Sequence, residues 1–119
     1  MSETYIPRPG VVTQSPSPEQ TITATANGLV QNKRGIVKLA HASVGIAATF
    51  PSAPAIGADY VVVNTLGGTH TLTLPTGMTF DGTNNRVTLD AANDFVYFIV
   101  ISSARVLVLG SSSAAYSAV

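Results

Sequence analysis

Apolar and polar residues alternate along most of the chain after its first twenty residues. The clearest case is SVGIAATF, residues 43–50, in which Val44, Ile46, Ala48 and Phe50 recur at every second position. A β-strand with one buried face produces this period of two, because successive side chains point to opposite faces. No window shows a convincing period of 3.6 residues, so the pattern predicts strands throughout.

These alternating segments are short and are separated by turn-forming residues. Gly, Pro, Asn and Asp interrupt the pattern every eight to twelve residues, roughly the spacing found in sandwiches and barrels. We therefore predict an all-β fold, a small antiparallel β-sandwich or barrel-like domain. The expected strands cover residues 20–26, 36–42, 43–50, 58–66, 69–74, 86–89, 95–102 and 105–110.

The two ends of the chain differ from this central region. Residues 1–19 contain four prolines, which fix φ and remove backbone donors, so this segment is expected to be extended. It is either a loose tail or, because it carries several apolar residues, an arm that clamps onto a neighbour. We predict an extended N-terminal arm at 1–19, a β domain at 20–110 and a C-terminal tail at 111–119.

Two of the expected strands are apolar on both faces. YVVVN covers residues 60–64 and FVYFIVI covers residues 95–101. An antiparallel strand with one face in water should alternate, so both segments require a cover on their second face. That cover is either another copy of the chain or the chain's own loops. We favour another subunit, because an exposed and uncharged FVYFIVI would promote aggregation.

The composition agrees with burial of surface against other chains. Charged residues make up 10% of the 119 residues and the formal net charge is zero, whereas a typical soluble domain has ~25% charged residues. A monomer that stays dispersed in water needs a charged surface, and this chain has little charge to supply one. The neutral balance also argues against a nucleic-acid partner.

Several classes of site and location are disfavoured by the sequence. The chain contains no cysteine, which excludes disulfides and thiolate metal sites. The segment MSETYIPRPG at its start lacks the apolar core of a signal peptide. The longest unbroken apolar run, FVYFIVI, is far shorter than the ~20 residues that a membrane helix needs, so we expect no membrane partner.

The stretch NTLGGTHTLTLPTG, residues 64–77, contains a double glycine next to His70. A phosphate-binding loop would lead from a strand into a helix, but THTLTL alternates like a strand. We therefore predict a tight hairpin in which both glycines have positive φ and Thr65 lies opposite His70. Four apolar residues would share the core face, with His70 at its rim: Val61, Val63, Leu72 and Leu74.

The polar residues do not form a recognisable catalytic set. His41 and His70 are the two histidines, and no serine stands in a G-x-S-x-G turn. A histidine at a strand edge or an interface is the more common situation. We expect neither histidine to act as a base, and we predict that the protein is not an enzyme and uses no cofactor.

The segment DGTNN has oxygen-bearing residues at alternate positions, Asp81, Thr83 and Asn85, as a calcium loop does. Such a loop also needs a glycine at its sixth position and a glutamate at its twelfth. Arg86 and Ala92 stand at those positions. We therefore predict a plain turn, which Asp-Gly and Asn-Asn both favour, and no metal site.

Basic residues gather in QNKRGIVK, which contains Lys33, Arg34 and Lys38. The region from Asp59 to Asp94 holds four acidic residues and one basic residue. The basic segment is either a solvated turn or one half of a complementary contact, in which it meets an acidic patch on a neighbouring subunit.

The residues from 57 onward resemble a known family of proteins. The order GADYVVVNTLGGTHTLTLPTG, followed by DGTNNRVTLDAANDFVYFIVISSARVLVLG, is similar to small β modules of tailed-bacteriophage virion proteins. The resemblance covers residues 57–110. An arm ahead of a single β domain is more similar to the capsid decoration (cement) proteins than to tail fibres. The family often has a tryptophan near the end of this pattern; this chain has no tryptophan, and Arg105 stands near that place.

The resemblance implies a non-enzymatic structural protein on the capsid exterior. Such proteins commonly form homotrimers, bind the major capsid protein and hold the shell closed. The alternative is a tail-fibre or baseplate module that binds a receptor or carbohydrate. The residues expected to contact the capsid are Tyr5, Ile6, Pro7, Arg8, Val11, Val12, Lys33 and Arg34.

Overall fold

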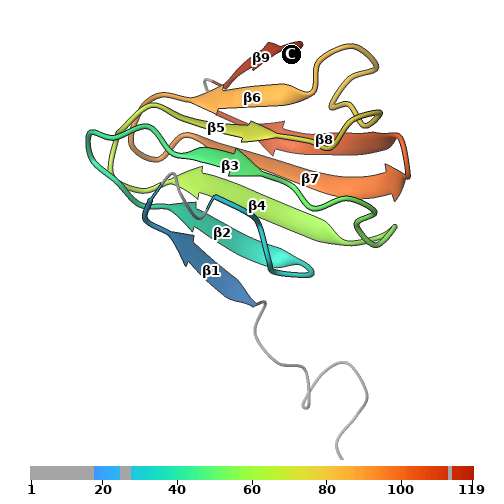
Figure 1. Ribbon diagram of the computed structural model, residues 1–119, viewed down its shortest axis with the longest axis horizontal. Helices are drawn as coiled ribbons and strands as arrows, with labels where there is room; N and C mark the ends of the chain where they lie inside the picture. Colours follow the sequence, from blue (N-terminus) through green and yellow to red (C-terminus); the bar gives the residue numbers. More distant parts are fainter. Residues whose placement is uncertain (1–17, 25–27, 113) are drawn as a thin grey trace, which may run out of the picture.

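The computed structural model describes residues 18–24, 28–112 and 114–119. The described residues form nine strands, which belong to two sheets packed face to face (Figure 1). They contain no helix, and hence none that is long and apolar enough to cross a membrane. The predicted all-β class is confirmed, and the architecture is a sandwich.

Five strands form the larger sheet and four form the smaller one. The larger sheet has the order β1 (Glu19–Ile22), β2 (Gly35–Leu39), β4 (Asp59–Asn64), β7 (Phe95–Ser102) and β8 (Arg105–Ser111). The smaller sheet has the order β3 (Ala47–Thr49), β5 (His70–Thr73), β6 (Arg86–Leu89) and β9 (Ala115–Ser117).

Both sheets are mixed, so the prediction of an antiparallel sandwich was wrong in this respect. Strands β1, β2 and β4 are parallel to one another, and β3 is parallel to β5. Between β2 and β4 the chain passes through β3 in the other sheet. It therefore returns to the starting end of β2 before it enters β4, and the two strands run in the same direction.

The predicted hairpin of residues 58–66 and 69–74 was also wrong. These segments form β4 and β5, which lie in different sheets. On β4 the core residues are Tyr60, Val62 and Asn64, whereas Val61 and Val63 lie on the outer face. Alternation had identified two faces but not which of them meets the second sheet.

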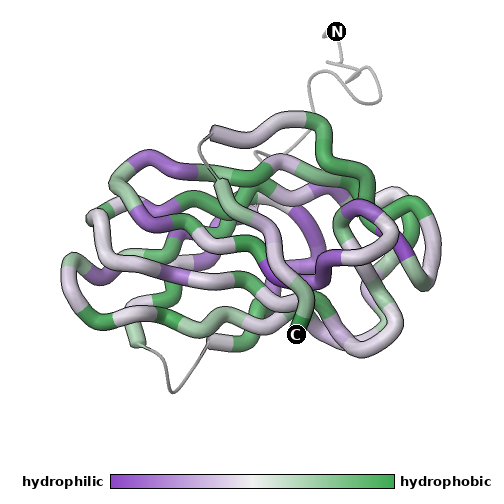
Figure 2. The backbone as a smooth tube through the Cα atoms, turned by 90° about the horizontal axis from the view of Figure 1, so that it is seen from above, coloured by the Kyte–Doolittle hydropathy of each residue, from purple (hydrophilic) through white to green (hydrophobic). Residues whose placement is uncertain are grey.

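The core between the sheets is built mainly from inward-facing residues at alternate positions of the strands, and Figure 2 shows how hydropathy changes along the chain. Its centre is a cluster of aromatic rings. The ring of Phe50 packs edge-on against Tyr60 and Phe98, with centroids 4.7 and 5.6 Å away. Phe80 packs perpendicular to Phe98 at 5.8 Å. These rings join both sheets into one apolar core.

The segment 43–50 follows the predicted alternation only in part. Ile46, Ala48 and Phe50 are buried, whereas Val44 is 51% exposed. Strand β3 begins only at Ala47, and the backbone amide of Val44 donates to the Nδ1 atom of His41. The residues before β3 thus form a turn, in which alternation does not control burial.

The expected C-terminal tail contains a strand that the sequence analysis did not predict. Strand β9 pairs with β6 and extends the smaller sheet. Its central residue, Tyr116, packs against Phe80 with ring centroids 5.5 Å apart. The small polar residues around Tyr116 give no alternating pattern, so this single aromatic residue was the available signal.

The start of the described chain is attached to the larger sheet. The carbonyl oxygen of Pro18 accepts a hydrogen bond from the backbone amide of Ile36, and Glu19 begins β1. The last two residues of the predicted arm therefore belong to the β domain. The expected capsid-contacting residues Tyr5, Ile6, Pro7, Arg8, Val11 and Val12 lie outside the described residues.

Candidate interaction surface

The outer face of the larger sheet is the main candidate for a functional surface. Strand register places Ile36, Val61 and Tyr97 side by side on β2, β4 and β7. It also places Ile99 beside Leu107 on β7 and β8. The outer apolar face comprises Ile36, Val61, Val63, Phe95, Tyr97, Ile99, Ile101, Leu107 and Leu109.

The β7–β8 side of this face is the most exposed. Ile101, Leu107 and Leu109 have 47%, 45% and 50% of their surfaces accessible. Every described strand belongs to one of the two sheets, so none packs on this face (Figure 1). The FVYFIVI segment thus has one side in the core and the other on the outer apolar face.

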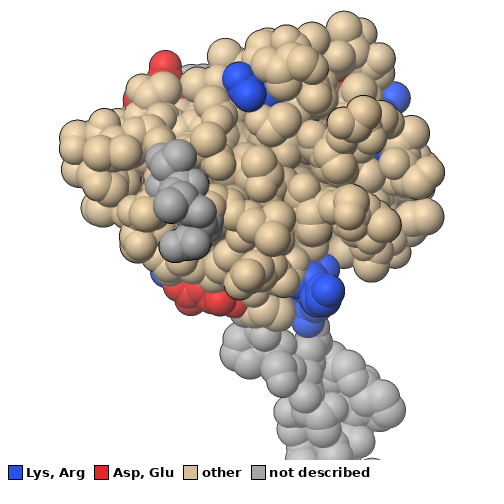
Figure 3. All heavy atoms as spheres, viewed as in Figure 1, with Lys and Arg blue, Asp and Glu red and all other residues tan. Residues whose placement is uncertain are grey.

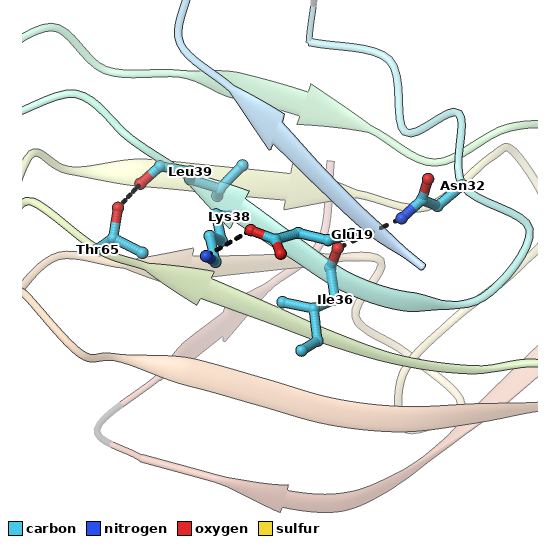
Figure 4. A network of polar contacts seen from close by, with 6 residues as sticks. All are labelled: Glu19, Asn32, Ile36, Lys38, Leu39 and Thr65. Carbon is cyan, nitrogen blue, oxygen red and sulfur yellow. Dashed lines mark hydrogen bonds and ion pairs between the residues drawn. The ribbon is translucent and has the colours of Figure 1, made fainter. Parts of the chain in front are cut away.

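An ion pair borders the outer apolar face at the edge strand β1. The Lys38 ammonium lies 2.5 Å from the Glu19 carboxylate, and both side chains are substantially exposed (Figure 4). An exposed pair of this kind contributes only about 0–1 kcal/mol. Its position is more informative than its energy, because it marks where the apolar surface ends.

Charged residues are sparse on the face of the molecule shown in Figure 3, where Lys, Arg, Asp and Glu appear mainly near the outline. Lys33 and Arg34 are both exposed in the turn before β2. Lys38–Glu19 is the one ion pair within the described ranges, so neither Lys33 nor Arg34 has an acidic partner there. Their charges remain available for another molecule.

Two of the four acidic residues between Asp59 and Asp94 accept hydrogen bonds within their own turns. Asp94 is buried, and its carboxylate accepts hydrogen bonds from the amides of Asp90 and Ala91. Hydrogen bonds from the backbone amides of Asn84 and Thr83 hold the pKa of Asp81 below its usual value. The Asp94 carboxylate is thus buried within its own loop, whereas Asp81 is exposed and also interacts electrostatically with Arg105.

His70 is fully buried, so its predicted position at the rim was wrong. Its Nδ1 atom accepts a hydrogen bond from the Ile46 amide at 2.9 Å, and Nε2 lies 3.0 Å from the His41 carbonyl oxygen. This pairing requires a neutral ring with its proton on Nε2. Burial lowers the pKa of His70, which favours the same neutral form.

The double glycine serves close packing around His70. Gly67 has φ of 102°, as predicted, but Gly68 is outside the positive-φ region. A Cβ atom on Gly68 would lie 2.6 Å from the His41 carbonyl oxygen and 2.7 Å from the His70 ring. Glycine is therefore required at position 68 by space and at position 67 by backbone conformation.

Asn64 is a structural residue that the sequence analysis did not single out. Its buried side-chain amide donates to the carbonyl oxygens of Gly68 and Leu89, and its Oδ1 atom accepts from the Gly67 amide. Leu89 belongs to β6, so this side chain ties the two sheets together. The signal in the sequence was a polar residue, Asn64, at the end of the otherwise apolar segment YVVVN.

A cleft of about 520 Å³ opens at one end of the sandwich. The loops 29–33 and 51–55 form its sides, and Tyr60 also lines it. Turn-forming residues indicate loops at these positions, but the sequence pattern contains no sign of a cleft. Its lining combines the apolar residues Leu29 and Pro54 with Lys33.

The described ranges contain no cluster of three or more His, Asp or Glu side chains that could hold a metal ion. His41 and His70 hold the chain around residues 41–46 and 68–70 in place, as the contacts above show. The chain matches no protein-family model and no curated protein sequence. The outer apolar face, the unpaired cations and the cleft are therefore the features on which a functional proposal must rest.

Proposed function

We propose that this chain is a non-enzymatic structural protein of a tailed-bacteriophage virion, a decoration protein that binds the outer capsid surface. The observation that carries the proposal is the outer apolar face of the larger sheet. A surface of this kind is suited to permanent contact with other protein subunits. The resemblance of residues 57–110 to virion β modules supplies the kind of assembly.

In this proposal the outer apolar face is buried in a homotrimer. Contact along β4, β7 and β8 would remove exposed side chains such as Leu107 and Leu109 from water. Burial of apolar surface contributes about 25 cal/mol per Å². The low charge of the chain fits a protein whose subunits do not work alone.

Attachment to the major capsid protein would use the arm together with Lys33 and Arg34. Both cations are exposed and unpaired within the described ranges, so they can meet carboxylates of a partner. A trimer presents three copies of this contact at once. Even weak individual contacts then give firm attachment, since each binding event raises the effective concentration of the next.

The packing of the aromatic residues favours this function over carbohydrate binding. The rings of Phe50, Tyr60, Phe80 and Phe98 lie in the core, and sugar sites usually offer exposed aromatic rings beside polar groups. Tyr97 lies on the outer face, where its direct cross-strand neighbours are Val61 and Gly110.

The test is the copy number of the chain in purified particles of the phage that encodes it. We expect it in proportion to the capsomer positions of the shell. A copy number of a few per particle would instead indicate a tail component, and absence from the particle would overturn the proposal.

A binding experiment tests the contact residues. A Lys33→Ala/Arg34→Ala variant should co-sediment less with capsids that lack the protein, and this loss should depend on salt concentration, since salt screens the wild-type contact. The matched control is Ala42→Glu/Ser43→Glu, which changes the net charge by the same amount in the exposed loop after β2. Equal binding by both variants would remove Lys33 and Arg34 from the proposed contact.

A further inference from the structure

The cleft at the end of the sandwich has one firmly built side. The side chain of Gln20 donates to the Leu29 carbonyl oxygen and accepts from the amides of Gln31 and Asn32. The Tyr60 hydroxyl donates to the Asn32 carbonyl oxygen at 2.9 Å. The loop 29–33 is thus held in a fixed shape before any ligand arrives, which lowers the entropic cost of binding.

The other side of the cleft is a proline-containing loop with a strained residue. Pro51 and Pro54 flank Ala53, which has φ of 55°. A non-glycine residue in this region costs of order 1–3 kcal/mol and often marks a functional surface. The cleft therefore has two preformed sides with apolar side chains and a cation, Lys33, on its lining.

The described chain begins beside this cleft. Continuing the register of β1 and β2 places Pro18 next to Gly35, and Gly35 lies next to Tyr60. Two strand spacings separate Pro18 from Tyr60, or ~10 Å. Because β1 runs parallel to β2, the residues before Pro18 leave the sheet at the end where Lys33 and the cleft lie.

We propose that residues 3–7 of the chain's own N-terminal arm dock in this cleft. Residues 1–17 can span about 56 Å when extended, which far exceeds the distance to be crossed. The attachment at Pro18 gives the arm a high effective concentration at the cleft. A segment from another molecule would have to compete with this tethered one.

The chemistry of residues 3–7 matches the lining of the cleft. Glu3 is the one acidic residue in the sequence before Pro18, and it can pair with Lys33. Tyr5 and Ile6 supply apolar side chains for the surface formed by residues such as Leu29 and Pro54. The charge and the apolar lining of the cleft therefore both match residues 3–7 of the arm.

This docking goes beyond the proposed function, and it involves two residues that are also expected to contact the capsid. Tyr5 and Ile6 cannot fill the cleft and contact a capsid at the same time. The experiment below needs no capsid, so its outcome is separate from that of the proposed function.

A spin label on the arm tests the docking directly. The chain contains no cysteine, so a Ser2→Cys variant of the full chain can carry a single nitroxide. We expect strong broadening of the amide resonances of residues 29–33 and of Ser52, Ala53 and Ala55, the residues of the 51–55 loop that carry an amide proton. The resonance of Ala92, which lies toward the opposite end of the strands, should stay sharp. Sharp resonances at the cleft would overturn the proposal.

Matched variants test which residues dock. In the spin-labelled chain, Tyr5→Ala/Ile6→Ala should abolish the broadening at the cleft, whereas Val11→Ala/Val12→Ala should retain it. Lys33→Glu should weaken the broadening, and adding Glu3→Lys should restore it. Equal effects of the two arm variants, or no recovery on charge exchange, would contradict the assignment of residues 3–7.

A mixing experiment tests whether the arm binds its own domain. Isotope-labelled chains without a nitroxide are mixed with unlabelled chains that carry it. Docking within one chain predicts no broadening at the cleft of the isotope-labelled molecules. Broadening there would show that the arm is exchanged between molecules and would overturn docking within one chain.

Discussion

The amide of Ile46, just before β3, donates a hydrogen bond to the Nδ1 atom of His70 at 2.9 Å, at the start of β5. This bond joins the loop that leads into β3 to the first residue of β5, the strand that pairs with β3 in the smaller sheet. The acceptor must be an unprotonated nitrogen, so the bond exists only while the ring is neutral. The fold thus contains a buried group whose protonation opposes the native structure.

The first prediction concerns pH. The folded pKa of His70 is lowered by burial, so the unfolded chain binds a proton more readily. Stability is then fully present above the unfolded pKa, about 6.5, and falls as the pH drops through and below it. Urea unfolding at pH 7.5 and pH 5.5 should show the lower free energy at pH 5.5.

A control isolates His70 from the other titrating groups. The His70→Asn variant should be less stable at pH 7.5 and should show a smaller loss between pH 7.5 and pH 5.5. An unchanged pH dependence in this variant would assign the effect to other residues.

The second prediction concerns Asn64. Asn64→Ala should lower the free energy of unfolding by roughly 2–4 kcal/mol, because it removes the hydrogen bonds of a buried side chain to Gly67, Gly68 and Leu89. Asn85→Ala is the control, since its side chain accepts from the exposed Val119 amide and should cost under about 1 kcal/mol. Equal losses in urea unfolding would contradict the role of Asn64 in joining the sheets.

The contrast between these residues shows what the sequence could and could not predict. Alternation correctly placed Ile46, Ala48 and Phe50 in the core. It also placed His70 and Leu72 on one face of their strand, and both are buried. A period of two identifies the faces of a strand but does not specify its partner strand.

The sheet assignment of residues 58–66 and 69–74 failed for that reason. The double glycine was interpreted as a hairpin turn, whereas Gly68 is needed for its close approach to His41 and His70. Such packing depends on a residue more than twenty positions away in the chain. The cleft was missed because its two loops come together only when both sheets are assembled.

The third prediction compares two glycines. Gly68→Ala should be severely destabilising, because its Cβ would lie 2.6 Å from the His41 carbonyl oxygen. Gly77 has φ of 88° but nothing within 4 Å of an added Cβ, so Gly77→Ala should cost about 1–2 kcal/mol from backbone strain alone. Thermal unfolding of both variants would check this order, and a milder effect at position 68 would show that the 64–70 segment can move.

The fourth prediction concerns the outer apolar face. Ile99 and Leu107 are cross-strand neighbours on β7 and β8 and both lie on this face. An Ile99→Glu/Leu107→Glu variant places two like charges where the proposed trimer excludes water, and unpaired buried charges are strongly unfavourable. We expect the wild-type chain to sediment as a trimer at micromolar concentration and the variant to sediment as a monomer.

The control for this prediction is Val44→Glu. Val44 is at least as exposed as Leu107 but lies in the turn before β3, outside the outer apolar face. This variant should remain a trimer, since a solvated charge at that position opposes no contact. A stable interface of ordinary size buries ~800 Å² per partner, and two charges within such an area are enough to prevent association. A wild-type chain that sediments as a monomer would remove the outer apolar face as a subunit interface, and dissociation of Val44→Glu as well would place the interface elsewhere.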